Sequence, residues 1–402
     1  LKVIIDFVPN HVARDYADFT AAHPAPTGMT SLGEQDDSSV HWKEENDFFY
    51  YPGKALRLPV ENQTYVEIPA KASGNAYTAE PGVNDWYDTI KLNYCDTPSR
   101  TWSKMFDIVA FWASAGVDGF RCDMVELVPP EFFKWLISRV KKLYPHIIFV
   151  AEVYQKTLYA KYIREVGFDL LYDKSGMYDA VRAIVEKNVN DSGVPVEAWQ
   201  STKRITGNWQ FLGDLQPYML NFLENHDEQR FASDFFGKDA KNSFAALYAS
   251  LLLNQAPFML YAGEEVGEKG MDTEGFSGMD GRTTIFDWWA PSALTRLYRY
   301  IHGDSTALTE NETALLERYR KVMRFAAEDK AVGEGVVYDL CYCNYSSDGF
   351  NPDRHFAFLR DYKEETQLVV CNFSKNDADV RIVIPEHAFQ WLEMPETDKF
   401  NQ

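Results

Sequence analysis

The sequence predicts an α/β fold made of parallel strands, followed by a smaller antiparallel β domain. Apolar runs of strand length alternate with helical patterns from about residue 96 to 328, which favours parallel β/α units. From about residue 333 onward only strand-like runs follow one another. Polar residues follow four of the buried strands, at the ends where α/β barrel enzymes place their active sites.

Six buried parallel strands are expected, at 3–8, 117–122, 147–152, 168–173, 218–223 and 257–262. Helical spacing of apolar residues predicts the helices between them. These helices are expected at 99–115, 129–144, 156–165, 177–188, 241–253 and 310–326. The helix at 129 starts with two prolines, which the first turn of a helix tolerates.

Residues 13–95 interrupt this pattern. They are polar, rich in aromatic residues, Pro and Gly, and too long for a plain loop. We therefore expect an inserted domain with a few short strands, such as TYVEIP (64–69), inside a catalytic region formed by 1–12 and 96–328. Residues 329–402 should form a C-terminal β domain whose fourth and last strand contains DVRIVIP (379–385).

Composition excludes several classes of partner. The net charge of −20 argues against nucleic acid and anionic membranes, which select basic surfaces, and suits a neutral substrate. Five cysteines without a CxxC pair predict neither a disulfide framework nor a zinc site. The longest apolar run, 243–263, is broken by Asn254, Gln255 and Pro257, so no membrane span is expected.

The chain starts at Leu1, directly in a strand, with no visible signal peptide. This start looks like the middle of a protein. The compartment, cytoplasmic or periplasmic/secreted, is therefore left open, as is the oligomeric state.

The stretch GVDGFRCDMVEL (116–127) carries the first candidate site residues. Arg121 and Asp123 are two apart in a strand, so their side chains should point the same way. A neighbouring arginine should keep the carboxylate ionised, as a nucleophile at a strand end requires. The alternative is a purely structural ion pair.

Three other strand ends carry comparable groups. They are Asn10-His11 after 3–8, Glu152 at the end of 147–152, and Asn225-His226-Asp227 after 218–223. In a closed barrel such ends converge on one face. Two carboxylates flanking a bond are the groups that glycoside hydrolysis uses.

Each of these groups fits a role in that reaction. Asp123 would attack, while Glu152, which follows an apolar run, should have its pKa raised by desolvation, as a general acid needs. Asp227 would stabilise the oxocarbenium-like state, and His11 and His226 would bind sugar hydroxyls. Metal binding by the histidines and carboxylates is a competing interpretation, which no HxH or HExxH spacing supports.

Four stretches resemble, in order and spacing, the four signature regions of the α-amylase superfamily of glycoside hydrolases. They are DFVPNH (6–11), GFRCD (119–123), AEV (151–153) and NHD (225–227), joined by LNY (92–94) and NQAPFMLYAGEEVG (254–267). The resemblance covers nearly the whole chain. It implies a (β/α)8 TIM barrel, an inserted domain after barrel strand three, a C-terminal β-sandwich, and retaining cleavage of α-glucosidic bonds.

The resemblance also implies residue roles. By motif match, Asp123 is the nucleophile, Glu152 the acid/base and Asp227 the transition-state stabiliser. Arg121, His11 and His226 match residues around the sugar at the cleaved bond. Asn10 matches a position that often binds structural calcium. The chemistry itself needs no cofactor.

The sequence departs from the family at three points. Only six barrel strands are seen, so the first two are apparently absent and the barrel should not close as given. The C-terminal domain looks short. Glu126 and Leu127 stand where many α-amylases carry Lys-His. We expect a hydrolase of α-1,4-linked, starch- or glycogen-like glucans. A transglycosylase with the same first step and a non-catalytic carbohydrate-binding barrel are the alternatives.

Overall fold

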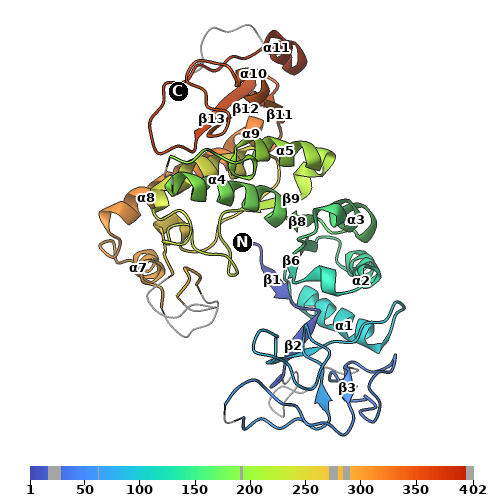
Figure 1. The fold of residues 1–402 in the computed structure, drawn as a ribbon. Coiled ribbons are helices and arrows are strands. Elements are labelled where there is room, and N and C mark those ends of the chain that lie inside the picture. The colour runs from blue at the N-terminus through green and yellow to red at the C-terminus, as the bar shows by residue number, and fades with distance from the viewer. Residues whose placement is uncertain (17–28, 62, 191–192, 271–278, 284–289, 395–402) are drawn as a thin grey trace. The chain divides into compact units, whose positions relative to one another are not determined.

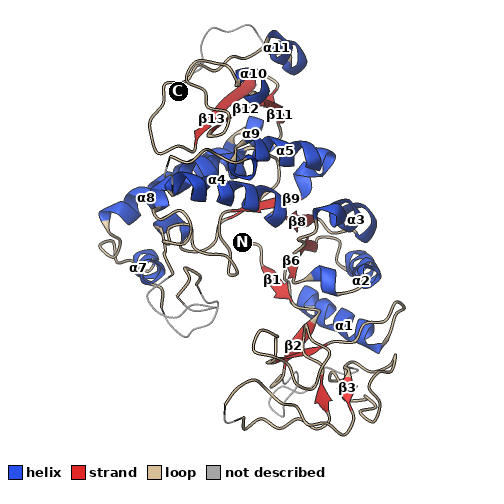
Figure 2. Cartoon of the chain, viewed as in Figure 1, coloured by secondary structure: helices blue, strands red, loops and turns tan. Residues whose placement is uncertain are grey.

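A computed structural model describes residues 1–16, 29–61, 63–190, 193–270, 279–283 and 290–394. The chain divides into two compact units, Leu1–Tyr172 and Asp173–Gln402 (Figures 1 and 2). Within the described residues, no helix combines the length and the apolar composition needed to cross a membrane.

The first unit is built on a parallel sheet. Its strands, in spatial order, are β1 (Ile4–Phe7), β6 (Gly119–Cys122), β7 (Ile148–Ala151) and β8 (Leu170–Tyr172). Every residue of β6 is buried. A Cβ at Gly119 would come within 2.7 Å of the Ile148 carbonyl oxygen, so only glycine allows the two strands this approach.

Helices connect these strands, as the alternating pattern predicted (Figure 2). Helix α1 (Arg100–Ser114) follows the inserted residues and leads into β6, and α2 (Pro130–Leu143) leads into β7. Trp102 of α1 packs edge-on against Phe132 of α2, with ring centroids 5.5 Å apart. The helical segment before β8 is α3 (Tyr159–Lys161), flanked by a 3-10 turn and a π-helical turn, Tyr162–Val166.

The inserted residues contain little regular structure. β2 (His11–Ala13) pairs antiparallel with β5 (Thr89–Lys91), and β3 (Tyr50–Tyr51) pairs with β4 (Ala70–Lys71). The strand expected at 64–69 does not form; β4 starts directly after it. A buried ion pair of 2.6 Å between Lys104 of α1 and Asp47 fastens this region to the helix.

The second unit contains a parallel strand pair, β9 (Met219–Phe222) and β10 (Phe258–Met259). Its larger helices are α4 (Asp179–Val189), α5 (Lys203–Leu212), α6 (Phe244–Leu252), α7 (Ser292–Ile301) and α8 (Glu310–Glu328). Helices α5 and α7 are absent from the sequence prediction. Residues 271–278 and 284–289, which belong to the Gly- and Asp-rich segment between β10 and α7, lie outside the described residues.

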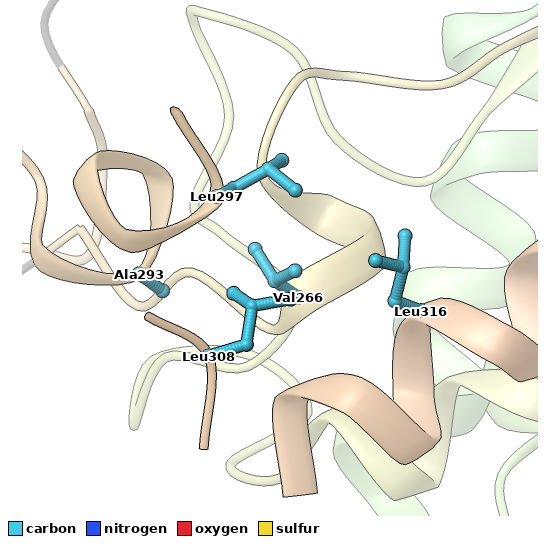
Figure 3. Close-up of a cluster of buried hydrophobic side chains, with 5 residues drawn as sticks. All are labelled: Val266, Ala293, Leu297, Leu308 and Leu316. Atoms are coloured by element: carbon cyan, nitrogen blue, oxygen red, sulfur yellow. The ribbon is translucent and has the colours of Figure 1, made fainter. Parts of the chain in front are cut away.

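Helix α7 is held by a small apolar cluster that joins it to α8 and to the 3-10 turn after β10. Figure 3 shows its side chains gathered at one point. They are Val266, Ala293, Leu297, Leu308 and Leu316. Ala293 and Leu297 of α7 are buried, and Leu294 and Tyr300 pack against the cluster. These residues recur at helical spacing, a signal that the sequence prediction overlooked.

The end of the second unit is an antiparallel sheet of three strands, β11 (Val336–Asp339), β12 (His355–Tyr362) and β13 (Glu365–Asn372). The prediction of a fourth strand at 379–385 is wrong. The amide side chain of Asn344 donates to the Val383 carbonyl (2.9 Å) and accepts from its N–H (2.7 Å). At Val383 a side chain therefore takes the place of a neighbouring strand, while the Arg381 N–H donates to the Asp348 carbonyl at 2.9 Å.

Candidate active site

An arginine at the end of β6 gathers three carboxylates. Arg121 Nη1 donates to Asp123 Oδ1 at 2.6 Å and to Asp6 Oδ1 at 3.1 Å. Arg121 Nη2 lies 3.0 Å from Glu152 Oε1. The guanidinium also lies over the ring of Tyr172, 5.5 Å from its centroid. Side chains from the ends of β1, β6, β7 and β8 thus meet at one cation.

Strand register explains why these groups meet. Asp6 lies opposite Arg121 in the parallel ladder. The ladder continues one residue past the strands, because Asp123 N–H donates to the Phe7 carbonyl (2.9 Å) and Glu152 N–H to the Cys122 carbonyl (3.1 Å). Asp123 and Glu152 are therefore the first residues beyond two neighbouring strands. The predicted common direction of Arg121 and Asp123 is confirmed by their hydrogen bond.

The ionisation of Asp123 differs from the sequence-based expectation. Burial raises the pKa of Asp123 to about 7, against the opposing pull of Arg121, and the neighbouring Glu152 and Asp6 carboxylates add to the rise. The expectation that Arg121 would keep this carboxyl ionised is wrong below about pH 7, because the effect of burial outweighs that of the guanidinium, which also contacts Asp6 and Glu152. This carboxyl titrates near neutral pH rather than near its ordinary value of about 4.

This shift predicts the acidic limb of the pH profile. A nucleophilic carboxylate must be ionised, so kcat/KM should fall with decreasing pH around a midpoint near 7. Initial rates on a maltooligosaccharide between pH 4 and 9 measure it. A midpoint at or below about 4.5, typical of unperturbed carboxyls, would contradict the prediction.

Glu152 is almost fully buried, at 2% exposed, and is held by two donors in addition to Arg121. Met124 N–H donates to its Oε2 (2.9 Å), and the Tyr154 hydroxyl donates to its Oε1 (2.6 Å). Glu126 holds the same loop, accepting from the N–H groups of Tyr154 (2.9 Å) and Gln155 (3.1 Å). Glu126, one of the two residues that replace the Lys-His pair of many α-amylases, therefore holds the backbone beside Glu152 in place.

Sequence reasoning missed Tyr154. Its signal was its position, two residues after Glu152, which puts both side chains on one side of an extended chain. Replacing Tyr154 with phenylalanine should lower kcat on maltoheptaose by about 10-fold or more, the value of one hydrogen bond to a charged group. Because the hydroxyl would act through Glu152, the loss should be much smaller on an aryl glycoside whose leaving group needs no proton.

Glu126→Gln, which keeps a carbonyl acceptor for one of the two N–H groups, is the matched control for Tyr154→Phe. Its effect on kcat should be the smaller of the two. Equal losses of Tyr154→Phe on both substrates would assign the tyrosine a purely structural role.

In the second unit, a turn after β9 presents His226 and Asp227. Asn225 Oδ1 accepts from the N–H groups of Asp227 and Glu228, each at 2.9 Å, which fixes the turn. His226 Nε2 lies 3.4 Å from Asp227 Oδ2. Arg282 Nε donates to the Asp227 carbonyl at 2.5 Å. The roles of Asn225, Glu228 and Arg282 in this turn were not foreseen.

Glu228 anchors the turn to the residues around the start of α4. Its carboxylate lies 3.0 Å from Lys174 Nζ and 3.5 Å from Arg182 Nη1, and accepts from the Tyr178 hydroxyl at 3.0 Å. These partners lie about 50 positions earlier in the chain, so no local sequence signal revealed them.

Asn10 and His11 lie where β1 leads into the inserted residues. The His11 ring packs against Trp86, with centroids 5.2 Å apart, and burial lowers its pKa, as does the nearby Lys91. Asn10 is fully buried and donates to the Gly74 carbonyl at 2.9 Å. The predicted calcium ligand, Asn10 Oδ1, accepts a hydrogen bond from the Lys91 ammonium. These residues do not fit a calcium ion, because a cationic side chain already binds that oxygen.

The chain is similar in sequence to known carbohydrate-active proteins. MalA of Haloarcula japonica, described as an α-amylase, is 28% identical over 269 residues, covering 67% of this chain and 32% of MalA. The α-1,4-glucan:maltose-1-phosphate maltosyltransferase of Rhodospirillum rubrum is 37% identical over 104 residues, covering 25% of this chain and 15% of the transferase. The aligned part of the chain thus spans about a third of the length of MalA and about 15% of the length of the maltosyltransferase.

Among solved structures, Amy13B of Eubacterium rectale superposes with a TM-score of 0.59 at 17% identity. The alignment covers 94% of this chain and 71% of Amy13B, and at this identity it shows the fold alone. The family model described as "Alpha amylase, catalytic domain" matches residues 1–332. This match covers most of the chain and agrees with its parallel β/α units, so the chain belongs to the α-amylase superfamily of glycoside hydrolases.

Proposed function

We propose that the protein is a retaining α-glycosidase that hydrolyses α-1,4-glucosidic bonds in starch- or glycogen-like glucans. One observation carries the proposal: Asp123 and Glu152 follow neighbouring strands and share the guanidinium of Arg121. Two carboxyls that contact one guanidinium lie close to one another, as a nucleophile and an acid/base that serve the same bond must. The retaining course is what the resemblance of GFRCD (119–123) and AEV (151–153) to the family's signature regions implies.

The chemistry would proceed in two displacements. Asp123 attacks the anomeric carbon and forms the glycosyl ester, while Glu152 transfers its proton to the departing glycosidic oxygen. Glu152, now ionised, then removes a proton from water, whose oxygen attacks the anomeric carbon and releases Asp123. Arg121 would hold Asp123 in line, and Tyr154 would orient the Glu152 carboxyl.

The remaining residues would bind the sugar. In this proposal Asp227 stabilises the positive charge that develops on the ring, and His11 and His226 donate hydrogen bonds to ring hydroxyls. The fixed turn around Asn225 supports such a role, because a carboxylate stabilises a transition state best when it is already oriented. The net charge of −20 suits a neutral glucan.

The test is a product profile of the purified protein on maltoheptaose, pullulan and trehalose, followed by NMR of the newly formed reducing ends. Shorter maltooligosaccharides, released first as the α-anomer, are expected. Initial release of the β-anomer would contradict the retaining mechanism. Cleavage of trehalose alone would contradict the assigned bond type. The absence of any turnover would favour a non-catalytic carbohydrate-binding protein.

A second candidate is an α-glucan transglycosylase, which shares the first displacement. It is supported by the 37% identity to a maltosyltransferase over 104 residues. In that reaction a sugar hydroxyl takes the place of water. Products longer than maltoheptaose, or elongation of maltoheptaose with release of phosphate when maltose 1-phosphate is added, would favour the transferase.

A further inference from the structure

Three segments of the first unit meet at one buried ammonium group. Lys91, the last residue of β5, donates to Asn10 Oδ1 beyond β1 and to the main-chain carbonyl of Leu127 (3.1 Å). Leu127 ends the 3-10 turn Val125–Leu127 that follows Asp123. Lys91 is 7% exposed and Asn10 is fully buried. The ammonium therefore ties the inserted residues both to the end of β1 and to the turn after the candidate nucleophile.

The chemistry of this junction is that of a cation site. Taking a charged group out of water is costly unless it is well bonded. Both oxygens that bind the Lys91 ammonium are neutral, one from a side-chain amide and one from a peptide carbonyl. Oxygens of these two kinds are also ordinary calcium ligands. The junction thus provides oxygens of the kind that bind calcium, and here they accept hydrogen bonds from the Lys91 ammonium.

The lysine is held firmly in this position. Lys91 pairs with His11 in the β2–β5 ladder, and its own N–H donates to the Ala72 carbonyl at 2.9 Å. A calcium ion lying about 2.3–2.6 Å from the Asn10 and Leu127 oxygens would stand directly against the ammonium. Two like charges at such a distance repel each other strongly, most of all away from bulk water.

We propose that the Lys91 ammonium takes the place of a metal cation at this junction, so that the inserted domain is fastened to the barrel region without calcium. The inference is independent of which reaction the protein catalyses. It also links Lys91 to the active site, because the turn that it holds through Leu127 starts directly after Met124, whose N–H donates to Glu152.

The experiment is thermal unfolding of the whole chain at neutral pH, once with millimolar EDTA and once with millimolar CaCl2, together with calorimetric titration of calcium. The Tm should be the same in both solutions and the titration should show no binding heat. A wild-type Tm that rises with calcium or falls with EDTA would overturn the proposal.

Lys91→Met tests the lysine itself, since methionine fills similar space but donates no hydrogen bonds. It should lower the Tm by roughly 3–10 °C, because the buried Asn10 oxygen and the Leu127 carbonyl both lose their donor. Lys71→Met is the matched control: this lysine belongs to the same inserted domain, is partly exposed and pairs with Glu67, and its loss should shift the Tm less. An unchanged Tm in Lys91→Met would also overturn the proposal.

Discussion

Replacing Asp123 with asparagine is expected to lower kcat/KM on maltoheptaose by about 10⁴-fold or more. Asparagine has nearly the same shape but no anionic oxygen, so the glycosyl ester cannot form. Removing the attacking group of a covalent mechanism costs this much because the remaining groups cannot take over its role. A 10⁴-fold loss corresponds to about 5.5 kcal/mol of transition-state stabilisation.

The same variant should fold at least as well as the wild type above pH 7. The pKa of Asp123 in the folded protein, about 7, lies above that of an unfolded aspartate, near 4. The folded state therefore binds the proton more tightly, and the free energy of unfolding falls as the pH rises from about 4 to about 7. Asparagine does not titrate, so this decrease should be absent from the variant. Urea unfolding at several pH values measures it.

Asp6→Asn is the matched control for the Asp123 variant. Asp6 also contributes a carboxylate to Arg121, at 3.1 Å, but lies at the end of β1 and is proposed for no chemical step. Its replacement should reduce kcat/KM by orders of magnitude less. Turnover by Asp123→Asn close to that of the wild type, or equal losses in the two variants, would refute the assignment of the nucleophile.

The sequence allowed the central pair to be predicted because the signals are local. Period-2 alternation put Arg121 and Asp123 on one side of β6, and a carboxyl at the end of an apolar run marked Glu152. Parallel β/α units imply that neighbouring strand ends meet, and the hydrogen-bonded register of β1, β6 and β7 shows that they do.

The features of the site that the sequence did not reveal depend on residues that are far apart in the chain. The hydrogen bond from Lys91 to Asn10 spans 81 positions, and the bonds from Glu126 to the loop after Glu152 span 28 and 29. The pKa of Asp123 depends on how deeply the carboxyl is buried and on how many carboxylates share Arg121. Neither quantity follows from adjacency in the chain.

In the Glu152→Gln variant, two different substrates should distinguish the role of Glu152 as general acid from its role as general base. With maltoheptaose the departing oxygen needs a proton, so kcat/KM should fall by about 10²–10⁴-fold, the usual contribution of a general acid. With an aryl α-maltooligoside whose phenol leaves without protonation, the first displacement should remain fast. The second displacement still needs a base for water, so a burst of phenol followed by slow turnover is expected.

Azide provides the sharpest form of this test, because an anionic nucleophile needs no base. In Glu152→Ala, azide should attack the glycosyl ester and restore turnover on the aryl substrate, with an α-glycosyl azide as product, since two inversions give net retention. In Asp123→Ala there is no ester to attack, and any azide product should be the β-anomer, formed by a single inversion. The anomeric configuration, read by NMR, therefore assigns the two carboxyls independently of rates. An α-azide from the Asp123 variant or a β-azide from the Glu152 variant would show that the two roles are reversed.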